Sequence, residues 1–423
     1  MSAFSIPLSG LAASSDSLNV IANNLANLNT DGYKDESLSF SDVFNQLQGV
    51  SQNGDPIQFG SGVQVAGETS NTTNGTVSTT GVASNMALQG NGFFVVQDTA
   101  NNETSYTRNG DFTVNSSGQL CTTGGELVMG YPATNGVVST TSSLAPIDVN
   151  QAANIPASPT STLTMDTNLD SAATTGTTFS SPITVYDSLG TSHVLTVNYT
   201  NTGANTWSYN VTIPAADVGG STAQTVASGT MTFNASGDLS AVTDTTSGST
   251  ASTTSISGIN ITGLADGASD MSMTWNLAGS SGATTVTQQN SASATSSTSQ
   301  NGYTVGALTG YSVLSDGTVE GQFSNNQTLA LGQVAVASFA NVQGLSQLGG
   351  SDVQATFASG AAVIGKAGAG GNGTITGGAV ELSNVSLSSE FANMIVAQQT
   401  YDANAKVLTT MDQISQATVQ LIS

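Results

Sequence analysis

The sequence predicts a mainly β protein with an α-helix at each terminus, in which nested β-domains are inserted between two helices that pair as a coiled coil on assembly. Three observations predict this fold class. Sustained helical spacing of apolar residues occurs only near the two ends, and the more than 300 residues between them are rich in Ser, Thr, Gly and Asn. Short apolar runs in this middle part have the lengths of β-strands.

These patterns divide the chain into four predicted domains. They are a helical inner domain (1–29 with 386–423), an extended connector (30–72 with 364–385), a β-domain (73–146 with 300–363) and an outer inserted β-domain (147–299). Insertion at an exposed loop is a tolerated way of adding a domain to an existing one.

The first helix is predicted from a seven-residue spacing of leucines at 11, 18 and 25, with Ile21 and Leu28 filling the seam between them. This is the spacing of a helix that packs against another helix. The helix should stop in the segment 27–32, because Asn and Gly tolerate the left-handed backbone conformation that ends helices.

The last helix carries two overlapping apolar stripes. One recurs every seven residues from Leu387 to Leu408, and the other runs from Val407 to Leu421, with further apolar residues at 391, 395 and 396 beside the first. Apolar residues on several faces imply several neighbours, although the spacing also fits two amphipathic helices closing on one globular core. The predicted subunit-interface residues are Leu11, Leu18, Ile21, Leu25, Leu28, Leu387, Phe391, Met394, Ile395, Tyr401, Leu408, Met411, Ile414 and Leu421.

Two segments are predicted to connect the helices with the β-domains. Residues 37–72 mix short apolar runs with polar turns and predict an irregular or strand-like connector. The glycine-rich stretch Gly365–Gly378 is interpreted as a flexible or turning connector into the last helix, since it lacks the Gly-Lys-Ser/Thr ending of a phosphate-binding loop. Both segments are candidates for a joint between layers.

The β-domain is predicted from strand patterns on both sides of the insert. Residues 92–96 predict a buried strand, and Asn109-Gly110 predicts a tight hairpin between strands at 106–108 and 112–114. A strand, turn and strand are predicted at 311–323, and we expect strands from both sides to share one domain.

The insert 147–299 is predicted to be an independent β-domain with a turn at Asp187–Gly190. Serine- and threonine-rich stretches near 156–162 and 280–300 are interpreted as linkers.

Composition excludes several classes of function. Only 7% of residues are charged, the net charge is −23, and four cations are too few to neutralise a nucleic-acid backbone or to bind an anionic membrane. No apolar run is long enough to span a membrane, and the start lacks the features of a secretory signal peptide. The composition is typical of exported bacterial surface proteins, so we expect export without a cleaved signal.

No catalytic, cofactor or metal site is predicted, and we expect no enzyme activity. The chain has one His and one Cys, too few for a zinc site built from several His or Cys ligands. His193 is expected at the surface or in a turn, Cys121 is assigned no role, and the scattered aspartates of the insert are interpreted as solvated.

The terminal segments resemble the signatures of a known family. At one end these residues are Ala22–Lys34, and at the other Ser383–Leu387, Met394–Gln398 and Tyr401–Lys406. Both are similar to the terminal signatures of the bacterial flagellar axial proteins, which include rod, hook and hook-junction subunits. The residues that carry the resemblance, and that we expect at a joint, are Asn23, Asn24, Asn27, Asn29, Thr30, Gly32, Tyr33, Lys34 and Asn404.

Within this family the interior resembles the hook subunits most. The stretches concerned are Asn91–Phe94, Tyr106–Gly110, Gly130–Pro132, Val185–Gly190, Asn301–Tyr303 and Leu331–Gln333. The large insert also favours a hook subunit over a distal rod subunit. One departure is Gln399, where the family often has Arg, so an ion pair between subunits is in doubt there.

The resemblance implies a structural subunit of the extracellular flagellar hook. Many copies would polymerise into a flexible helical tube that transmits torque from rod to filament as a universal joint. The implied partners are identical subunits, the rod, the hook cap, the hook-junction proteins and the flagellar type III export apparatus. The alternatives are a distal rod or hook-junction subunit, a secreted β-solenoid adhesin and, least favoured, a β-rich hydrolase.

Overall fold

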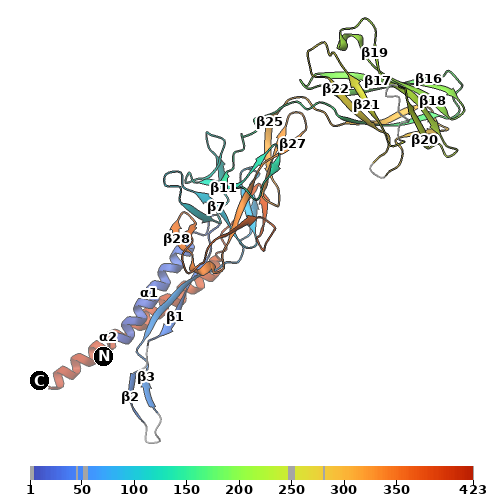
Figure 1. Ribbon diagram of the computed structural model, residues 1–423. Helices are drawn as coiled ribbons and strands as arrows, with labels where there is room; N and C mark the ends of the chain where they lie inside the picture. Colours follow the sequence, from blue (N-terminus) through green and yellow to red (C-terminus); the bar gives the residue numbers. More distant parts are fainter. Residues whose placement is uncertain (1–3, 44–45, 51–55, 246–252, 280–281, 423) are drawn as a thin grey trace. The chain divides into compact units, whose positions relative to one another are not determined.

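The computed structural model describes residues 4–43, 46–50, 56–245, 253–279 and 282–422. The chain forms two compact units. The first comprises residues 1–152, 310–322 and 328–423, and the second comprises residues 153–309 and 323–327 (Figure 1). The mainly β fold with a helix near each terminus confirms the predicted fold class.

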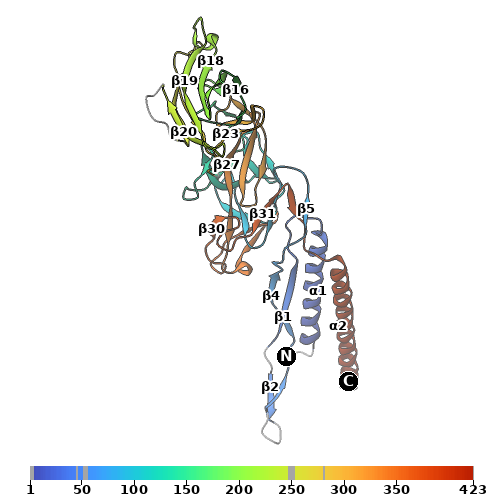
Figure 2. The ribbon, with the colours of Figure 1, turned by 90° about the vertical axis from the view of Figure 1, so that its right-hand side faces the viewer.

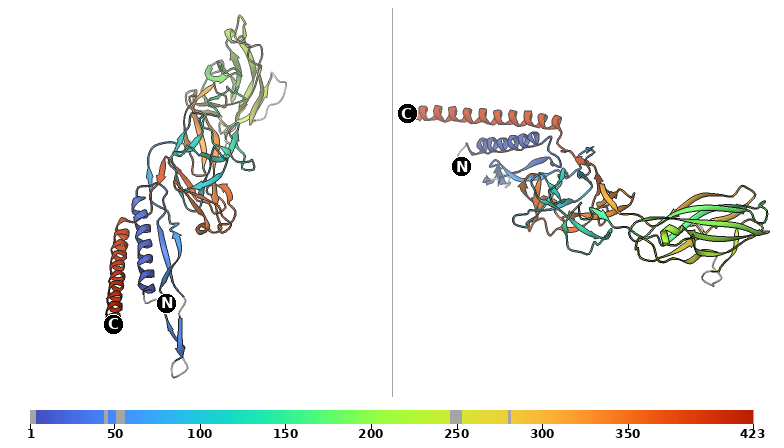
Figure 3. Two further views of the ribbon diagram at one scale, coloured as in Figure 1. Left: turned by 90° about the vertical axis from the view of Figure 1, so that its left-hand side faces the viewer. Right: turned by 90° about the horizontal axis from the view of Figure 1, so that it is seen from above.

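Two helices lie side by side in the first unit, as Figures 2 and 3 show. They are α1 (Ser5–Ala26) and α2 (Leu387–Ile422). Helix α1 ends where its sequence predicts, because Asn27 leaves the helical conformation and its N–H bonds back to carbonyls of the last turn.

The connector after α1 forms strands that run beside it. Strand β1 (Glu36–Asp42) pairs antiparallel with β4 (Val63–Ser70), and β2 (Gln46–Val50) pairs in the same way with β3 (Pro56–Phe59). Strand β1 contacts α1 along its length (Figure 2). The first connector is therefore strand-like, one of the two forms that its sequence allows.

The β-structure of the first unit joins strands from both sides of the insert. In the main sheet, β7 and β11 pair with β27, so Phe94 lies opposite Val336 and Gly130 opposite Val334. This confirms that strands far apart in sequence share a sheet. The strands of this unit's β-structure are β5 (Val77–Thr79), β6 (Met86–Gln89), β7 (Phe93–Gln97), β8 (Thr104–Thr107), β9 (Phe112–Val114), β10 (Leu120–Thr122), β11 (Leu127–Thr134), β12 (Val137–Val138), β13 (Ala145–Pro146), β26 (Thr318–Phe323), β27 (Thr328–Ser338), β28 (Ser346–Gly349), β29 (Asp352–Gln354), β30 (Val363–Lys366), β31 (Thr374–Gly377) and β32 (Ala379–Glu381).

The predicted hairpin at Asn109-Gly110 is wrong. Strand β8 pairs with β7 and β29, whereas β9 pairs with β10. The adjacent Arg108 is buried and donates to the carbonyls of Leu88 and Gly90, and Gly110 lies so close to the Met86 carbonyl that an added Cβ would be 1.6 Å from its oxygen. These long-range contacts carry the chain across the sheet instead of reversing it.

The glycine-rich stretch 365–378 is likewise not a flexible connector along its whole length. Its two ends lie in β30, which pairs with β27, and in β31, which pairs with β6. The side chain of Ile375 is buried, and Gly373 packs where a Cβ would lie 2.2 Å from the Gln89 carbonyl oxygen. Here glycine permits close approach of two backbones.

The second unit is a β-sandwich. One sheet has the order β16-β17-β18-β19-β20, and the other has the order β21-β22-β15-β23, with β24 also paired to β15. A single apolar core from both sheets contains Trp207 and Trp275, with Tyr209 packed edge-on against Trp275. Its elements are β14 (Asn154–Ile155), β15 (Thr162–Asp170), β16 (Thr178–Tyr186), β17 (Ser192–Gly203), β18 (Thr206–Ile213), η1 (Ala215–Val218), β19 (Gln224–Phe233), β20 (Leu239–Asp244), β21 (Ser255–Ile261), β22 (Met271–Asn276), β23 (Val286–Gln289) and β24 (Ala294–Gln300); β25 (Gly306–Val313) begins in this unit and ends in the first.

Of the two predicted linkers, the one near 156–162 is free of strand up to β15, whereas the one near 280–300 is wrong over much of its length because it contains β23 and β24. Residues 294–300 form β24, which pairs antiparallel with β15 beginning at Thr162. Strand β15 alternates buried and half-buried residues, so Leu163, Met165 and Leu169 reach the core. The predicted turn at Asp187–Gly190 is confirmed, since β16 and β17 pair directly across it.

Stability of the first unit should depend on pH through Asp352 in β29. Burial, followed by the charge of Glu126, raises the pKa of Asp352 to about 7. The folded carboxyl keeps its proton to about pH 7, whereas the unfolded one loses it near 3.8, so unfolding releases a proton between these values. The free energy of unfolding should therefore fall as pH rises through this window, and D352N should reduce that fall in urea denaturation at pH 5 and pH 8. D42N, at an exposed residue of β1, is the control, and an unchanged pH dependence in D352N would contradict the assignment.

Candidate assembly site

The two helices pack in an antiparallel register fixed by two pairs of residues. At one end Gly10 lies against Asn404, so that a Cβ on Gly10 would be 2.7 Å from the Asn404 amide nitrogen. At the other end Asn24 donates to the Glu390 carboxylate over 3.3 Å. Each pair lies fourteen residues from the other on both helices, so the register is continuous.

Burial of the predicted interface residues differs between the helices. On α1, Ile21 is buried and the three predicted leucines are half-buried, as is Leu28 just beyond the helix end. On α2, Met394, Leu408 and Met411 are half-buried, whereas the larger group stays exposed: Leu387, Phe391, Ile395, Tyr401 and Ile414. The side chain of Leu421 lies outside the described part. Two helices closing on one core therefore do not account for the apolar surface of α2.

Helix α2 is also much longer than its partner. It has 36 residues against 22 in α1, and the antiparallel register places the start of α1 near residue 409 of α2 (Figure 3). The last turns of α2 thus extend past α1. Ile414 is 61% exposed and Val419 is 66% exposed in this extension.

A groove of about 750 Å³ runs between α1, α2 and the β1–β4 pair. Ile6, Leu38, Phe40, Val63 and Val396 supply apolar side chains to its walls. The groove and the exposed side of α2 give the helical part of the unit a large uncovered apolar surface.

A hydrogen-bonded hub at the base of the helices is centred on Asn24, which is 1% exposed. Its amide nitrogen lies 2.7 Å from an Asp35 carboxylate oxygen and 2.8 Å from the Glu36 carbonyl, besides its contact with Glu390. Its oxygen accepts from the Glu36 N–H and the Tyr33 hydroxyl, both at 3.0 Å. One buried amide thus joins α1, the connector and the first turn of α2.

The remaining signature asparagines extend this hub. Asn23 donates to the Tyr33 hydroxyl, and Asn27 accepts from Thr30 while donating to the Asn23 carbonyl. From the C-terminal side, Asn384 accepts from the Asp35 N–H at 2.7 Å and donates to carbonyls of the connector. The expected joint residues therefore come together, except Asn29, which is exposed, and Asn404, which lies far along α2.

Beside the hub, Glu381 forms a buried ion triad with two of the chain's four cations. Its carboxylate oxygens lie 2.6 Å from Lys34 Nζ and 3.3 Å from Arg108 Nη1, and its side chain is 1% exposed. The Gly75 N–H also donates to it over 2.8 Å. The triad ties together the segment after α1, the strand region of Arg108 and the segment before α2.

Gly32 lets these parts approach closely. It has φ 72°, its N–H donates to the Glu381 carbonyl at 2.7 Å, and a Cβ on it would lie 2.5 Å from the Asn109 nitrogen. Both the positive φ and the lack of space require glycine.

Burial is the main cause of the pKa shifts of the charged groups in this region. Burial lowers the pKa of Lys34, and the bond with Glu381 offsets this only in part. Burial also lowers the pKa of Arg108, and it raises that of Asp35, helped by the nearby Glu390. Each shift disfavours the charged form, so the ionic contacts are needed to compensate desolvation.

Sequence reasoning missed Glu381, Arg108 and Glu390 as members of this site. Asn384 was part of the C-terminal resemblance but not of the expected joint. The scarcity of cations was the available signal, because a buried Arg in such a chain needs a nearby acid.

Two residues considered in the sequence analysis, His193 and Cys121, lie outside this site. His193 is buried at the start of β17, so its expected surface position is wrong, because the aspartate of the preceding turn draws the ring inward. Cys121 is buried in β10 and stays without an assigned role. Among the described residues, no helix is long and apolar enough to cross a membrane.

Four family models match the chain in order. The flagella basal body rod protein model matches residues 6–34, and the flagellar basal body rod FlgEFG protein C-terminal model matches 376–421. Between them, the flagellar hook protein FlgE/F/G D1 domain matches 87–171 and the flagellar basal body protein FlaE D2 domain matches 150–303.

Relatives that match over nearly their whole length are flagellar hook proteins FlgE. The flagellar hook protein FlgE of Salmonella typhimurium is 37% identical over 441 residues, covering 99% of each chain. That of Rhizobium meliloti is 31% identical and covers 98% of this chain and 97% of its own. The crystal structure of Helicobacter pylori flagellar hook protein FlgE2 has the same fold at 14% identity, with a TM-score of 0.52 over 70% of this chain and 98% of that one.

Helical ends packed beside nested β-units, with rod-protein signatures at both ends, define a structural protein of the bacterial flagellar axis. Within that class, the chain belongs to the flagellar hook protein FlgE family.

Removal of the Glu381 charge should destabilise the first unit specifically. E381Q leaves two buried cations without a counter-ion, which should lower the free energy of unfolding by about 3–5 kcal/mol. Far-UV circular dichroism in urea would follow this loss, while tryptophan fluorescence serves as an internal reference because Trp207 and Trp275 both lie in the second unit.

The matched control is E320Q, at a half-buried position in β26. A stability of E381Q equal to that of E320Q would contradict a compensating role for this carboxylate.

Proposed function

We propose that the chain is a hook subunit that polymerises through its terminal helices into a helical tube and transmits torque from rod to filament. The observation that carries this proposal is the exposed apolar surface of α2, on faces that α1 does not cover. Ile395 is 55% exposed in the paired region, and Ile414 and Val419 are exposed in the extension. A soluble monomer gains nothing from such a surface, whereas neighbouring copies would bury it.

Burial of these side chains would make assembly strongly cooperative. Fully burying one Ile or Phe contributes about 1.5–3 kcal/mol, and several are exposed on each copy. A subunit at the end of a growing tube would bury only part of this surface. Addition of each further copy would then stabilise those already present.

The hub would give the tube its torsional stiffness. Because Asn24 and Glu381 connect both helices with the connector and the β-region, rotation of the helical layer would be passed to the β-layer through short polar contacts. We therefore place the stiff coupling at 24–36 with 381–390. This modifies the expectation of a loose joint in 365–378, which forms strands at both ends.

Bending would rely on the outer layer. The second unit contains neither Lys nor Arg, so contacts between neighbouring outer units would form without strong ion pairs. Weak polar contacts can break and reform as subunits slide. Gln399, exposed on α2, is neutral and would likewise form no ion pair with a neighbour.

The second unit favours assignment as a hook subunit over assignment as a rod subunit or an adhesin. It coincides with the matched D2 domain and distinguishes the chain from a rod subunit that lacks a large insert. A β-solenoid adhesin would not explain the helical ends. Passage through the flagellar export apparatus, addition under a hook cap and contact with rod and junction proteins belong to the same proposal.

A charge-neutral change on α2 should weaken polymerisation without unfolding the subunit. I395S removes apolar burial worth about 1.5–3 kcal/mol, so the soluble concentration in equilibrium with polymer should rise about tenfold to a hundredfold. Sedimentation of the full chain would measure this concentration, and circular dichroism would check the fold.

V137S, at an exposed valine in β12, is the control and should polymerise normally. If I395S and V137S sediment alike, the exposed side of α2 is not an assembly surface.

The place of the subunit in the flagellum can be tested directly. Gold-labelled antibody against residues 153–309 should mark the short curved segment between rod and filament in isolated flagella. Label on the straight rod or at the hook–filament junction would identify another axial subunit instead.

A further inference from the structure

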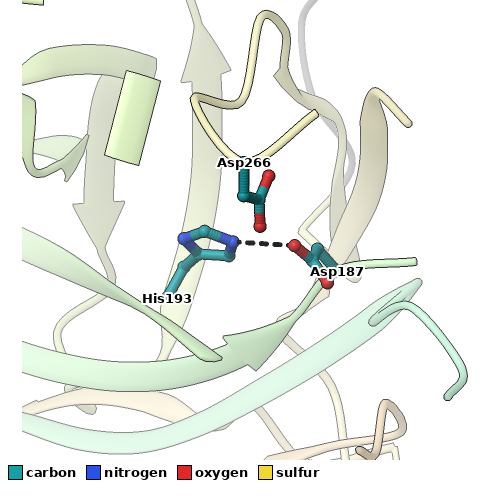
Figure 4. A group of neighbouring side chains, drawn as sticks. All are labelled: Asp187, His193 and Asp266. Atoms are coloured by element: carbon teal, nitrogen blue, oxygen red, sulfur yellow. Dashed lines mark hydrogen bonds and ion pairs between the residues drawn. The ribbon is translucent and has the colours of Figure 1, made fainter. Parts of the chain in front are cut away.

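Four side chains of the second unit converge at one end of the sandwich. Asp187 follows β16, His193 begins β17, Asp217 lies in η1 and Asp266 lies between β21 and β22. His193 Nε2 is 3.2 Å from an Asp187 oxygen, and Nδ1 is 3.2 Å from an Asp217 oxygen. Potential ligand atoms of Asp187, His193 and Asp266 all lie within 4.8 Å of one another (Figure 4).

Two members of this group are held rigidly. Asp187 is completely buried, and its Oδ1 accepts the N–H groups of Leu189 and Thr191, each at 2.8 Å. Its Oδ2 is thereby directed at His193, which is 4% exposed. Asp266 is exposed and leaves the group open to solvent on one side.

The arrangement is electrostatically incomplete. His193 Nε2 is within hydrogen-bond distance of Asp187, whereas the buried Nδ1 makes no hydrogen bond although an Asp217 oxygen lies 3.2 Å away. Asp187 and Asp266 also bring two carboxyl groups within 4.8 Å of each other, in a unit that has neither lysine nor arginine. Both features would be accounted for if a cation occupied the space between Nε2 and the two carboxylates.

The protein supplies no such cation from its own side chains. Residues 153–309 contain eight aspartates and neither lysine nor arginine. The four cations of the chain all belong to the first unit. Only His193 itself or an ion from solution can balance these acids.

We propose that His193 Nε2, Asp187 and Asp266 bind a divalent transition-metal ion of the zinc type. Imidazole and carboxylate are suitable ligands for such ions, and two ligands about 2.0–2.1 Å from a tetrahedral centre lie roughly 3.3 Å apart, close to the separation of Nε2 and Asp187. Water would complete the coordination. The ring proton would then lie on Nδ1, where the Asp217 carboxylate is 3.2 Å away and would need only a small rotation to accept it.

Binding would connect three chain segments of the outer unit. The β16–β17 turn supplies two ligands and the loop at Asp266 supplies the third, while the Asp217 carbonyl already accepts the Ala265 N–H at 2.9 Å. The ion would therefore stabilise a region where these loops meet. A stable outer unit would resist the repeated deformation expected of a rotating hook.

The test uses the full chain, freed of metal by a chelator, at pH 7.5. Calorimetric titration with Zn²⁺ should give one ion per chain, and the thermal transition of Trp207 and Trp275, which reports on the second unit, should move to higher temperature. H193Q and D266N should each weaken binding at least tenfold. D270N, at an exposed aspartate of the same loop, should bind as the unaltered chain does.

Three results would overturn the proposal. Absence of Zn²⁺ binding, with a thermal transition that depends on pH in the unaltered chain but not in H193Q, would mean that the site holds only a proton. An affinity in H193Q and D266N equal to that of the unaltered chain would mean that Zn²⁺ binds other surface acids. Equal affinity for Ca²⁺ and Zn²⁺ would exclude the imidazole as a ligand. D266N changes an exposed residue, so it remains informative if H193Q misfolds.

Discussion

The buried pairing of Glu381 with Lys34 and Arg108 is the constraint on which the first unit depends. The chain has four cations, and this carboxylate binds two of them. The insert separates Glu381 in sequence from both cations, and Lys34 and Arg108 need its carboxylate because burial disfavours their charged forms. The ends of the chain are thus fixed to the β-structure by charge, while their outer faces remain apolar.

This arrangement separates two kinds of contact. Within the subunit, polar groups determine geometry. Asn24 and Asn384 bind the connector at the end of α1 and before the start of α2, and Gly32 allows its backbone to approach that of Asn109. On the uncovered side of α2, the exposed apolar surface would, under the proposed assembly, provide affinity with little directional preference. A polymer that bends while it rotates needs both, since rigid subunits can shift against one another without losing contact.

The sequence predicted what local patterns determine. The helices, the end of α1 near Asn27 and the turn at Asp187–Gly190 follow from spacing and turn residues. The predictions were wrong where contacts between residues far apart in the sequence determine the local structure. Asn109-Gly110 does not form a hairpin because Arg108 is held by carbonyls on other strands, and the stretch near 294–300 is a strand because β15 lies beside it. The asparagines of the hub were identified by resemblance, whereas their partner acids were not, because the acids are specified only by the fold.

The two units of the chain differ in how their buried acids obtain positive counter-charge. In the first unit, the buried Glu381 is paired with Lys34 and Arg108, so its counter-charges come from the protein itself. In the second unit, Asp187 is equally buried but has only His193 as a possible cation. A unit without lysine or arginine cannot pair the buried Asp187 with either of these cations, so under the proposed metal site its positive charge would come from a bound ion. Under both proposals, the composition that would keep contacts between neighbouring second units weak would also favour a bound cation at Asp187.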